Sequence, residues 1–510
     1  MLVKTFGCAI IGINATIVTI EVNAEKGIQF FLVGLPDNSV KESYQRIVAS
    51  FANLDYKFPR RRLTINMAPA DIRKEGAAYD LPLAIGIMAV SSQVDATMLD
   101  QYIIMGELSL DGTVNPVKGV LPMAIKAREE GFKGIIIPKE NAKEAAIVDG
   151  VDVIGVEDLS EVVGFLNGER SIEPERIDMN LFAQEDVYSL DFMDVKGQEN
   201  IKRALEIACA GSHNVLLIGS PGSGKTMLAK RLPSILPPMT LAEALETTKI
   251  HSVAGLMGKH KTLMITRPFR SPHHSISDAG LCGGGSFPQP GEISLAHNGV
   301  LFLDEVPEIQ RHTLEILRQP MEDRVITISR AKMSVQFPAN FMLVAAMNPC
   351  PCGYYNHPDR ECVCKPGEVQ KYLNKISGPL MDRIDLHVEV LPVPYDELSD
   401  ARRGEPSAVI RKRVVKARKI QEERYRDYPG IYSNAQMTAS MLQKFCVLDA
   451  KGQESLGNAM RRLGLSARAY DRILKVSRTI ADLEGSEKIL AEHLAEAINY
   501  RSLDRDSWGS

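Results

Sequence analysis

One stretch of the sequence has the residue types needed to hold the phosphates of a nucleotide. Residues 219–226 read Gly-Ser-Pro-Gly-Ser-Gly-Lys-Thr, and they follow the apolar run Asn214–Ile218. Glycines let backbone N–H groups close around phosphates, and the N-terminus of a following helix favours anions. Lys225 would reach the β- and γ-phosphates, and the Thr226 hydroxyl would ligate Mg2+. This strand–loop–helix pattern predicts an ATP site made of Gly219, Ser220, Pro221, Gly222, Ser223, Gly224, Lys225 and Thr226.

Two later apolar runs also end in residues suited to phosphate chemistry. The run that begins at Gly299 ends at Asp304 and Glu305. Asp304 is a candidate Mg2+-side carboxylate, and Glu305 is a candidate general base for the attacking water. The run ending at Met347 is followed by Asn348, a candidate for orienting that water, although an ordinary turn asparagine is the alternative.

Four of the eight cysteines form two Cys-x-Cys pairs within residues 350–364. Four thiolates on one loop can close a tetrahedral shell around Zn2+, which would be structural because no coordination position stays open. The alternative is four reduced thiols without a metal. The candidate zinc ligands are Cys350, Cys352, Cys362 and Cys364.

Two regions have charges that could contact a nucleic acid. The alternating stretch from Ile326 ends at the basic residues Arg330 and Lys332, which could touch a phosphate backbone or belong to an ordinary surface hairpin. Residues 401–430 contain ten Lys or Arg and four acids, a local excess of +6 in a chain whose net charge is −4. Phosphate contacts need such local charge, but a solvated helix would look the same.

The elements that must position these residues fall into three segments. Residues 1–168 mix short strands and helices, residues 169–189 resemble a polar linker, residues 190–395 alternate strands and helices, and residues 396–510 are helical. The strands expected in the first segment are Ala15–Val22, Phe30–Val33, Leu63–Met67, Tyr102–Gly106 and Gly134–Ile137. The helices expected there are Ser39–Ala52, Leu81–Val90 and Pro122–Glu130.

Composition limits the class of protein. The chain has 510 residues, of which 45% are hydrophobic and 24% charged, as in soluble globular proteins. The net charge excludes a globally basic protein, and eight cysteines are too few for a disulfide framework of this size. No apolar run approaches the ~18 residues of a membrane span, and the N-terminal run alternates as a strand does rather than a signal peptide. We therefore expect a cytoplasmic protein without membrane contact.

Taken together, the motifs resemble those of AAA+ ATPases of the magnesium-chelatase-like class, in particular the ComM/YifB family. The resemblance covers nearly the whole chain. It is carried by Gly219–Thr226, Arg267–His274, Gly283–Gly285, Pro290–Asn298, Leu301–Glu305 and Ile376–Leu386. It implies an α/β fold, with an AAA+ P-loop core, a helical C-terminal lid and a cytosolic, hexameric ring whose active sites lie between subunits.

The resemblance also implies roles for single residues. The residues that would act in their own subunit are Lys225, Thr226, Asp304, Glu305 and Asn348. Arg383 would reach a neighbour's γ-phosphate; without the other motifs, a surface pair with Asp382 or Asp385 explains Arg383 better. Val195 and Gln198 would border the adenine. Arg468 resembles the sensor-2 arginine of AAA+ lids, with Arg472 as the competing candidate. The 326–332 stretch would face the central pore, and Gly283–Gly285 with Arg267, Arg270, His273 and His274 resembles the second insertion of the class.

The first segment resembles the α+β, ribosomal S5-like domain of Lon-type proteases, but without its catalytic chemistry. The nucleophile position holds Ala78 and the catalytic lysine position holds Leu121. Methyl and isobutyl groups can be neither nucleophile nor base, and Lys118 lies three residues away from the required place. We therefore expect an adaptor domain and not a protease.

The resemblance implies an ATP-driven DNA translocase or helicase that promotes branch migration in natural transformation and homologous recombination. The alternative is a chelatase-type ATPase that remodels a protein partner without DNA. A non-enzymatic scaffold is the third class, and the complete hydrolytic set argues against it.

Overall fold

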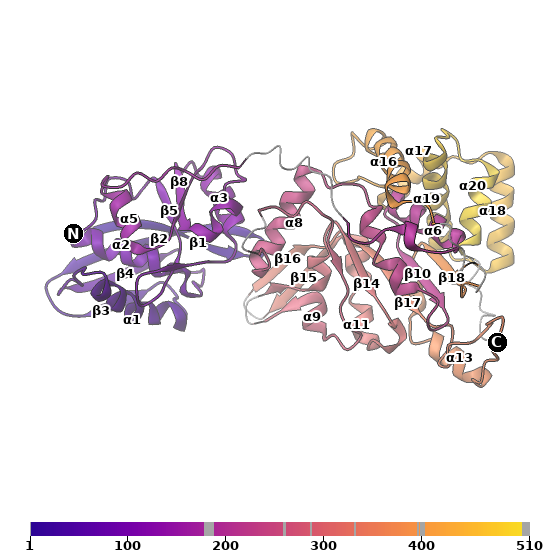
Figure 1. The fold of residues 1–510 in the computed structure, drawn as a ribbon, viewed down its shortest axis with the longest axis horizontal. Helices are drawn as coiled ribbons and strands as arrows, with labels where there is room; N and C mark the ends of the chain where they lie inside the picture. The colour runs from indigo at the N-terminus through magenta and orange to yellow at the C-terminus, as the bar shows by residue number, and fades with distance from the viewer. Residues whose placement is uncertain are drawn as a thin grey trace. The chain divides into compact units, whose positions relative to one another are not determined.

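A computed structural model describes residues 2–177, 188–258, 262–285, 288–330, 333–394, 397 and 403–501. The chain forms two compact units (Figure 1). The first contains Met1–Gln184 and Leu241–Met264, and the second contains Glu185–Thr240 and Ile265–Ser510. Within the described part of the chain, no helix is long and apolar enough to cross a membrane.

The first unit is built on a seven-stranded mixed sheet in the order β3-β4-β2-β1-β5-β8-β9. Strands β1, β2 and β4 are antiparallel neighbours, and the pairs β3–β4, β1–β5, β5–β8 and β8–β9 are parallel. The strands are β1 Leu2–Ile11, β2 Asn14–Glu25, β3 Phe30–Val33, β4 Arg62–Ala68, β5 Tyr102–Ile104, β8 Gly134–Pro138 and β9 Asp152–Val156, with a small hairpin of β6 Glu107–Leu108 and β7 Val114–Asn115.

The helices of this unit are α1 Asn38–Asn53, α2 Asp80–Val90, α3 Val120–Glu129, α4 Lys139–Ala145 and α5 Leu159–Leu166. All eleven residues of α2 are buried, which explains the apolar run that follows Asp80. The expected strands and helices of this segment are confirmed within a few residues. The N-terminal run is β1, paired with β2 along its whole length, and Gly12 makes the intervening turn with φ +63°.

One helix of the first unit comes from within the sequence segment 190–395. Helix α8, Leu241–Ala254, follows the nucleotide motif in the chain, yet residues 241–264 belong to the first unit. The Gly119 backbone N–H donates to the carbonyl of Ser252 over 3.1 Å. The buried Glu144 carboxylate accepts bonds from the Ser252 hydroxyl and from the Leu121 N–H. The sequence segment 190–395 is thus divided between the two units.

The second unit contains a five-stranded parallel sheet in the order β11-β14-β17-β10-β18. Its strands are β10 Val215–Gly219, β11 Phe269–Arg270, β14 Val300–Leu303, β17 Met342–Met347 and β18 Leu386–Val390. Every residue of β10, β14 and β17 is buried, as expected for parallel strands covered on both faces. Helix α6 Glu199–Gly211 precedes the first of these strands. The helices between the strands are α7 Lys225–Ala229, α9 Asp278–Cys282, α10 Glu292–Leu295, α11 Arg311–Glu315, α12 Arg318–Asp323, α13 Pro366–Leu373 and α14 Gly378–Met381.

Two short hairpins project from this sheet, and a group of helices completes the unit. The hairpins pair β12 Gly283–Gly284 with β13 Gln289–Pro290, and β15 Val325–Arg330 with β16 Met333–Pro338. The C-terminal helices are α16 Ser407–Arg424, α17 Ala439–Phe445, α18 Ala450–Leu463, α19 Ala467–Glu484 and α20 Ala491–Asn499. They share one apolar core with the sheet, and α16 and α19 both pack on α6. The expected helical C-terminal region is confirmed.

Candidate nucleotide site and cysteine cluster

The phosphate-binding motif lies where its strand order predicts. Parallel strands bring their carboxyl ends to one sheet edge, where α/β proteins bind ligands. Strand β10 lies between β17 and β18 in the sheet, and the loop after it leads into α7 at Lys225. Gly222 and Gly224 adopt φ +80° and +92°, a region that glycine enters without strain. The neighbouring strands β14 and β17 end at the same edge, before Asp304 and Asn348.

Six of the predicted residues take part in hydrogen bonds with one another. The Lys225 ammonium donates to the carbonyls of Gly219 and Ser220 over 2.7 and 3.0 Å, and to Asn348 Oδ1 over 3.3 Å. The Thr226 hydroxyl donates to Asp304 Oδ2 over 2.6 Å. Burial lowers the pKa of Lys225, while the Asp304 and Glu305 charges oppose that shift. The oxygens of Thr226 and Asp304 fit the preference of Mg2+ for hard ligands.

Glu305 has a partner that the sequence did not identify. Its backbone adopts φ +51°, and its side chain is 55% exposed. His274 Nδ1 lies 2.9 Å from Glu305 Oε2. The ring of His273 lies 4.0 Å from that of His274, centroid to centroid. The sequence analysis placed His274 in the stretch that resembles the second insertion of the class. The only signal for its contact with Glu305 was its position among polar residues just after β11.

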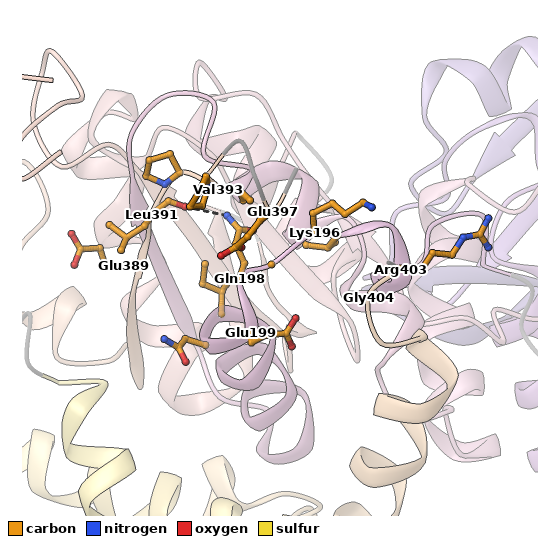
Figure 2. A pocket seen from close by; sticks show the side chains of 15 residues that line it. Lys196, Gln198, Glu199, Glu389, Leu391, Val393, Glu397, Arg403 and Gly404 are labelled. Atoms are coloured by element: carbon orange, nitrogen blue, oxygen red, sulfur yellow. Dashed lines mark hydrogen bonds between the residues drawn. The ribbon is translucent and has the colours of Figure 1, made fainter. Parts of the chain in front are cut away.

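A pocket of about 710 Å³ adjoins the phosphate loop (Figure 2). Val195 and Gln198 line it, together with the apolar side chains of Leu391 and Val393. Gln198 Nε2 donates to the carbonyls of Ser223 and Leu391 over 2.9 and 3.2 Å, which ties the pocket to the loop. The lining also contains charged side chains, among them Lys196, Glu389 and Glu397. The apolar side chains at this place could contact a nucleobase.

Arg383 and the two lid arginines have different surroundings. The Arg383 guanidinium is 6% exposed, lies 2.7 Å from the Glu322 carboxylate and donates to the carbonyl of Pro379. Arg468 is exposed near the start of α19, whereas Arg472, one turn later, lies 3.2 Å from the buried Asp385. Among the described residues, no hydrogen bond or ion pair joins Arg383 or Arg468 to the phosphate-site cluster.

The four predicted cysteines come together. Cys350 Sγ lies 3.3 and 3.7 Å from the sulfurs of Cys352 and Cys362, and those two sulfurs are 3.6 Å apart. Cys364 Sγ accepts from the Cys352 N–H, and all four sulfurs lie within 4.8 Å of one another. Sulfurs bound at ~2.3 Å around a tetrahedral Zn2+ would be separated by similar distances. This cluster could hold a metal ion.

The cysteine loop also contacts the phosphate loop. Gly353 has φ +85°, and a Cβ on it would lie 2.5 Å from Cδ of Pro221. The cysteine loop therefore packs against one side of the nucleotide motif.

The predicted DNA-contact residues differ in their surroundings. Arg330 is exposed at the end of β15 and donates to the carbonyl of Gly285 over 3.4 Å. Lys332 lies outside the described residues. In α16, Arg413 pairs with Glu206 and Glu405, and Arg424 pairs with Asp482. Of these pairs, Arg413–Glu206 joins the segment to α6, whereas Glu405 lies in the segment itself and Asp482 lies in α19.

Ala78 and Leu121, the residues expected at the nucleophile and lysine positions of a Lon-type protease, lie in helices of the first unit. Ala78 is in the short 3-10 helix Ala77–Tyr79, and Leu121 is fully buried in α3. The side chain of Lys118 lies against Gly255.

The fold and the site define an ATPase of the AAA+ class related to magnesium chelatase. Family models for this enzyme match three parts of the chain: "Magnesium chelatase, subunit ChlI" at residues 191–398, "Subunit ChlI of Mg-chelatase" at 20–141, and "Magnesium chelatase, subunit ChlI C-terminal" at 404–501.

Comparison with individual relatives identifies the family within this class. Competence protein ComM of Haemophilus influenzae is 46% identical over 502 residues, covering 98% of this chain and 97% of ComM. YifB of Escherichia coli is 44% identical over 500 residues, covering 98% and 96%. The chain therefore belongs to the ComM/YifB family. More distantly, the DNA replication licensing factor mcm6 of Dictyostelium discoideum is 24% identical over 329 residues, covering 62% of this chain and 34% of mcm6.

Proposed function

We propose that the protein is an ATP-hydrolysing ring motor that translocates on DNA and promotes branch migration in natural transformation and homologous recombination. The observation that carries the proposal is the presence at one sheet edge of two hydrogen-bonded pairs, Lys225–Asn348 and Thr226–Asp304, with Glu305 next to Asp304 in the chain. The name of the ComM relative, a competence protein, supports the biological setting. The name of the mcm6 relative, a DNA replication factor, supports the substrate.

The residues at the sheet edge divide the work of hydrolysis. The Lys225 ammonium would exchange its loop carbonyls for the β- and γ-phosphates, and Asn348 would orient the attacking water. Glu305 would take the proton from that water. Thr226 and Asp304 would hold Mg2+, which when bound offsets the charge on the phosphate oxygens. Val195 and Gln198 would place the adenine.

Assembly and DNA contact complete the proposal. In a hexameric ring, Arg383 would leave Glu322 and reach the γ-phosphate of the adjacent subunit, where such an arginine is worth ~10³–10⁵ in rate. Arg468 would report the nucleotide state to the lid. Arg330 and Lys332 would face DNA in the pore. The first unit would be a Lon-protease-like adaptor, because Ala78 and Leu121 replace the catalytic pair.

The test measures ATP turnover of the full chain with and without single-stranded and branched DNA, beside Glu305→Gln. We expect DNA to raise turnover, and the variant to bind ATP while turning over at least about 100-fold more slowly, because it lacks a general base. Mass photometry with ATP should show the hexamer. If DNA neither binds nor changes turnover, DNA translocation is wrong.

In that case the alternative is a chelatase-type ATPase that remodels a protein partner. The specific support for it is that all three matching family models describe magnesium-chelatase subunits. It predicts ATP turnover that depends on Glu305 but not on DNA.

A further inference from the structure

We propose that the first unit binds single-stranded DNA on a basic surface at the edge of its sheet. We define this basic edge by Lys26, Phe31, Arg60, Arg61 and Arg62. The inference rests on the proposed action on DNA, and it adds a contact region separate from Arg330 and Lys332. It gives a role to a unit that has the positions of a protease without the catalytic groups.

The three consecutive arginines are exposed and not neutralised. Arg60, Arg61 and Arg62 are all exposed, as are Lys26 and Lys57 nearby in the sequence. Among the described residues, no acidic side chain forms an ion pair with any of these five. Glu25 lies opposite Arg62 in the β2–β4 register, but its carboxylate accepts from the Asn23 side chain. A concentration of unpaired cations in a chain of net charge −4 fits a phosphate backbone.

An exposed aromatic ring lies among these charges. Phe31 is in β3, the edge strand of the sheet, and is 41% exposed. The Arg62 guanidinium lies 5.2 Å from the centre of its ring. Ile28, just before β3, is 83% exposed. Basic grooves with exposed aromatic rings bind single strands, because every unpaired base has a face that can stack.

The loop that presents the arginines is held in place. Phe58 packs between the rings of Tyr44 and Phe51, at 5.5 and 5.9 Å between centroids. The Lys57 N–H donates to Gln93 Oε1, and Gln93 Nε2 donates back to the Lys57 carbonyl. A fixed loop loses little conformational entropy on binding, so its cations act as a preformed site.

The test is binding of a fluorescein-labelled oligo-dT to the full chain, measured by anisotropy at several salt concentrations. R60A/R61A should bind about tenfold or more weakly at low salt. It should also flatten the salt dependence of log K by roughly 0.7 for each phosphate that the variant no longer neutralises. Phe31→Ala should bind at least about fivefold more weakly with an unchanged salt slope, because stacking is not ionic. The matched control R128A/K143A removes two exposed cations of the same unit and should bind like the unaltered chain.

Melting temperatures of the variants should match that of the unaltered chain, since all the changed side chains are exposed or half-exposed. If R60A/R61A and F31A bind oligo-dT as the unaltered chain does, while DNA still stimulates its ATPase, the basic edge is not a DNA site and only this inference fails. A protein strand added to β3 would then be the better occupant. If the unaltered chain binds no DNA at all, both this inference and the proposed translocation fail.

Discussion

At the residue scale, the environment of Glu305 decides how the proposed base meets its water. Its carboxylate lies 2.9 Å from His274 Nδ1, and His274 itself lies beside the ring of His273. A base contributes to catalysis only when it is oriented toward the proton it takes. We therefore interpret His274 as a positioning residue for Glu305.

Replacing His274 with alanine should lower kcat of ATP hydrolysis about tenfold and leave KM for ATP within about twofold, because orientation and not binding is lost. His274→Asn should restore part of the rate, since its amide can also donate. Steady-state kinetics at saturating DNA measure both parameters. His312→Ala, a change at an exposed histidine in the same unit, is the control. A rise in kcat for His274→Ala would mean instead that the contact holds Glu305 away from water.

At the element scale, helix α19 connects the lid with the segment that carries Arg383. Arg472 pairs with Asp385, and the Asn214 N–H also donates to this carboxylate over 2.8 Å. Burial would raise the pKa of Asp385, but Arg472, His213 and the Asn214 N–H together hold it below its usual range. Asp385 is therefore ionised in the folded chain at neutral pH.

Arg472→Ala should lower the free energy of unfolding by about 3 kcal/mol at pH 7, because a buried carboxylate loses its cation. The ion pair stabilises the fold above the unfolded-state pKa of Asp, about 4, and this contribution declines as pH falls further. The difference between the unaltered chain and the variant should therefore shrink below pH ~4. Urea unfolding at several pH values measures it.

The matched control is Arg468→Ala, which changes an exposed residue of the same helix and should cost less than about 0.5 kcal/mol. If Arg468 is the sensor-2 arginine, this variant should lose ATP turnover without losing stability. Normal turnover in Arg468→Ala would exclude that role and leave Arg472 as the candidate.

The cysteine loop is the second element whose order bears on the nucleotide site. The four sulfurs lie within 4.8 Å of one another, and their loop packs on Pro221 of the phosphate motif. A metal bound to the sulfurs would therefore stabilise a loop that contacts this motif. We expect one zinc per chain by elemental analysis of the purified protein.

Cys350→Ser should lose that zinc, lower the melting temperature and raise KM for ATP, because the loop no longer supports Pro221. Strong chelators should have the same effect on the unaltered chain. Cys282→Ser changes a cysteine outside the cluster and should keep the metal. Protein that is free of zinc and melts as Cys350→Ser does would contradict a structural metal.

At the scale of the whole molecule, helix α8 belongs to the first unit, although it follows the nucleotide motif of the second unit in the sequence. The chain passes between the two units at 184/185, 240/241 and 264/265. The anchor of α8 is the buried Glu144, whose carboxylate accepts from Leu121 and Ser252. Burial raises the pKa of Glu144, and these bonds oppose the shift only in part.

Two substitutions separate the bonds of Glu144 from its charge. Glu144→Ala should destabilise the first unit by about 1–3 kcal/mol, since it leaves the Leu121 N–H unpaired. Because the pKa of Glu144 is raised, the folded chain keeps the proton on this carboxyl to a higher pH than the unfolded chain does. The contribution of Glu144 to the free energy of unfolding therefore falls as pH rises above ~4.3, the ordinary pKa of a glutamate. Glu144→Gln keeps an acceptor without the charge, and should melt higher relative to the unaltered chain at pH 8 than at pH 5. Thermal melts at both pH values test this, and an equal difference at both would contradict it.

The local sequence was sufficient to predict the nucleotide motif and the core strands. The residues of a phosphate loop are consecutive, and Asp304 and Asn348 directly follow buried parallel strands, whose carboxyl ends must meet at one edge. The four cysteines lie within fifteen residues of one another, so their proximity was also readable. Strand β1 was not among the expected strands, because Leu2–Ile11 does not alternate strictly between apolar and polar residues.

The sequence by itself determined the chemistry available to this protein: a phosphate loop, two strand-end acids and a four-thiol loop, each encoded by residues close together in the chain. Only the tertiary structure decided that His274 meets Glu305, that Arg472 and not Arg468 pairs with Asp385, and that α8 belongs to the first unit. Those contacts join segments separated by tens of residues or more. Their partners are selected by packing and by the need to satisfy buried polar groups, which no local pattern records.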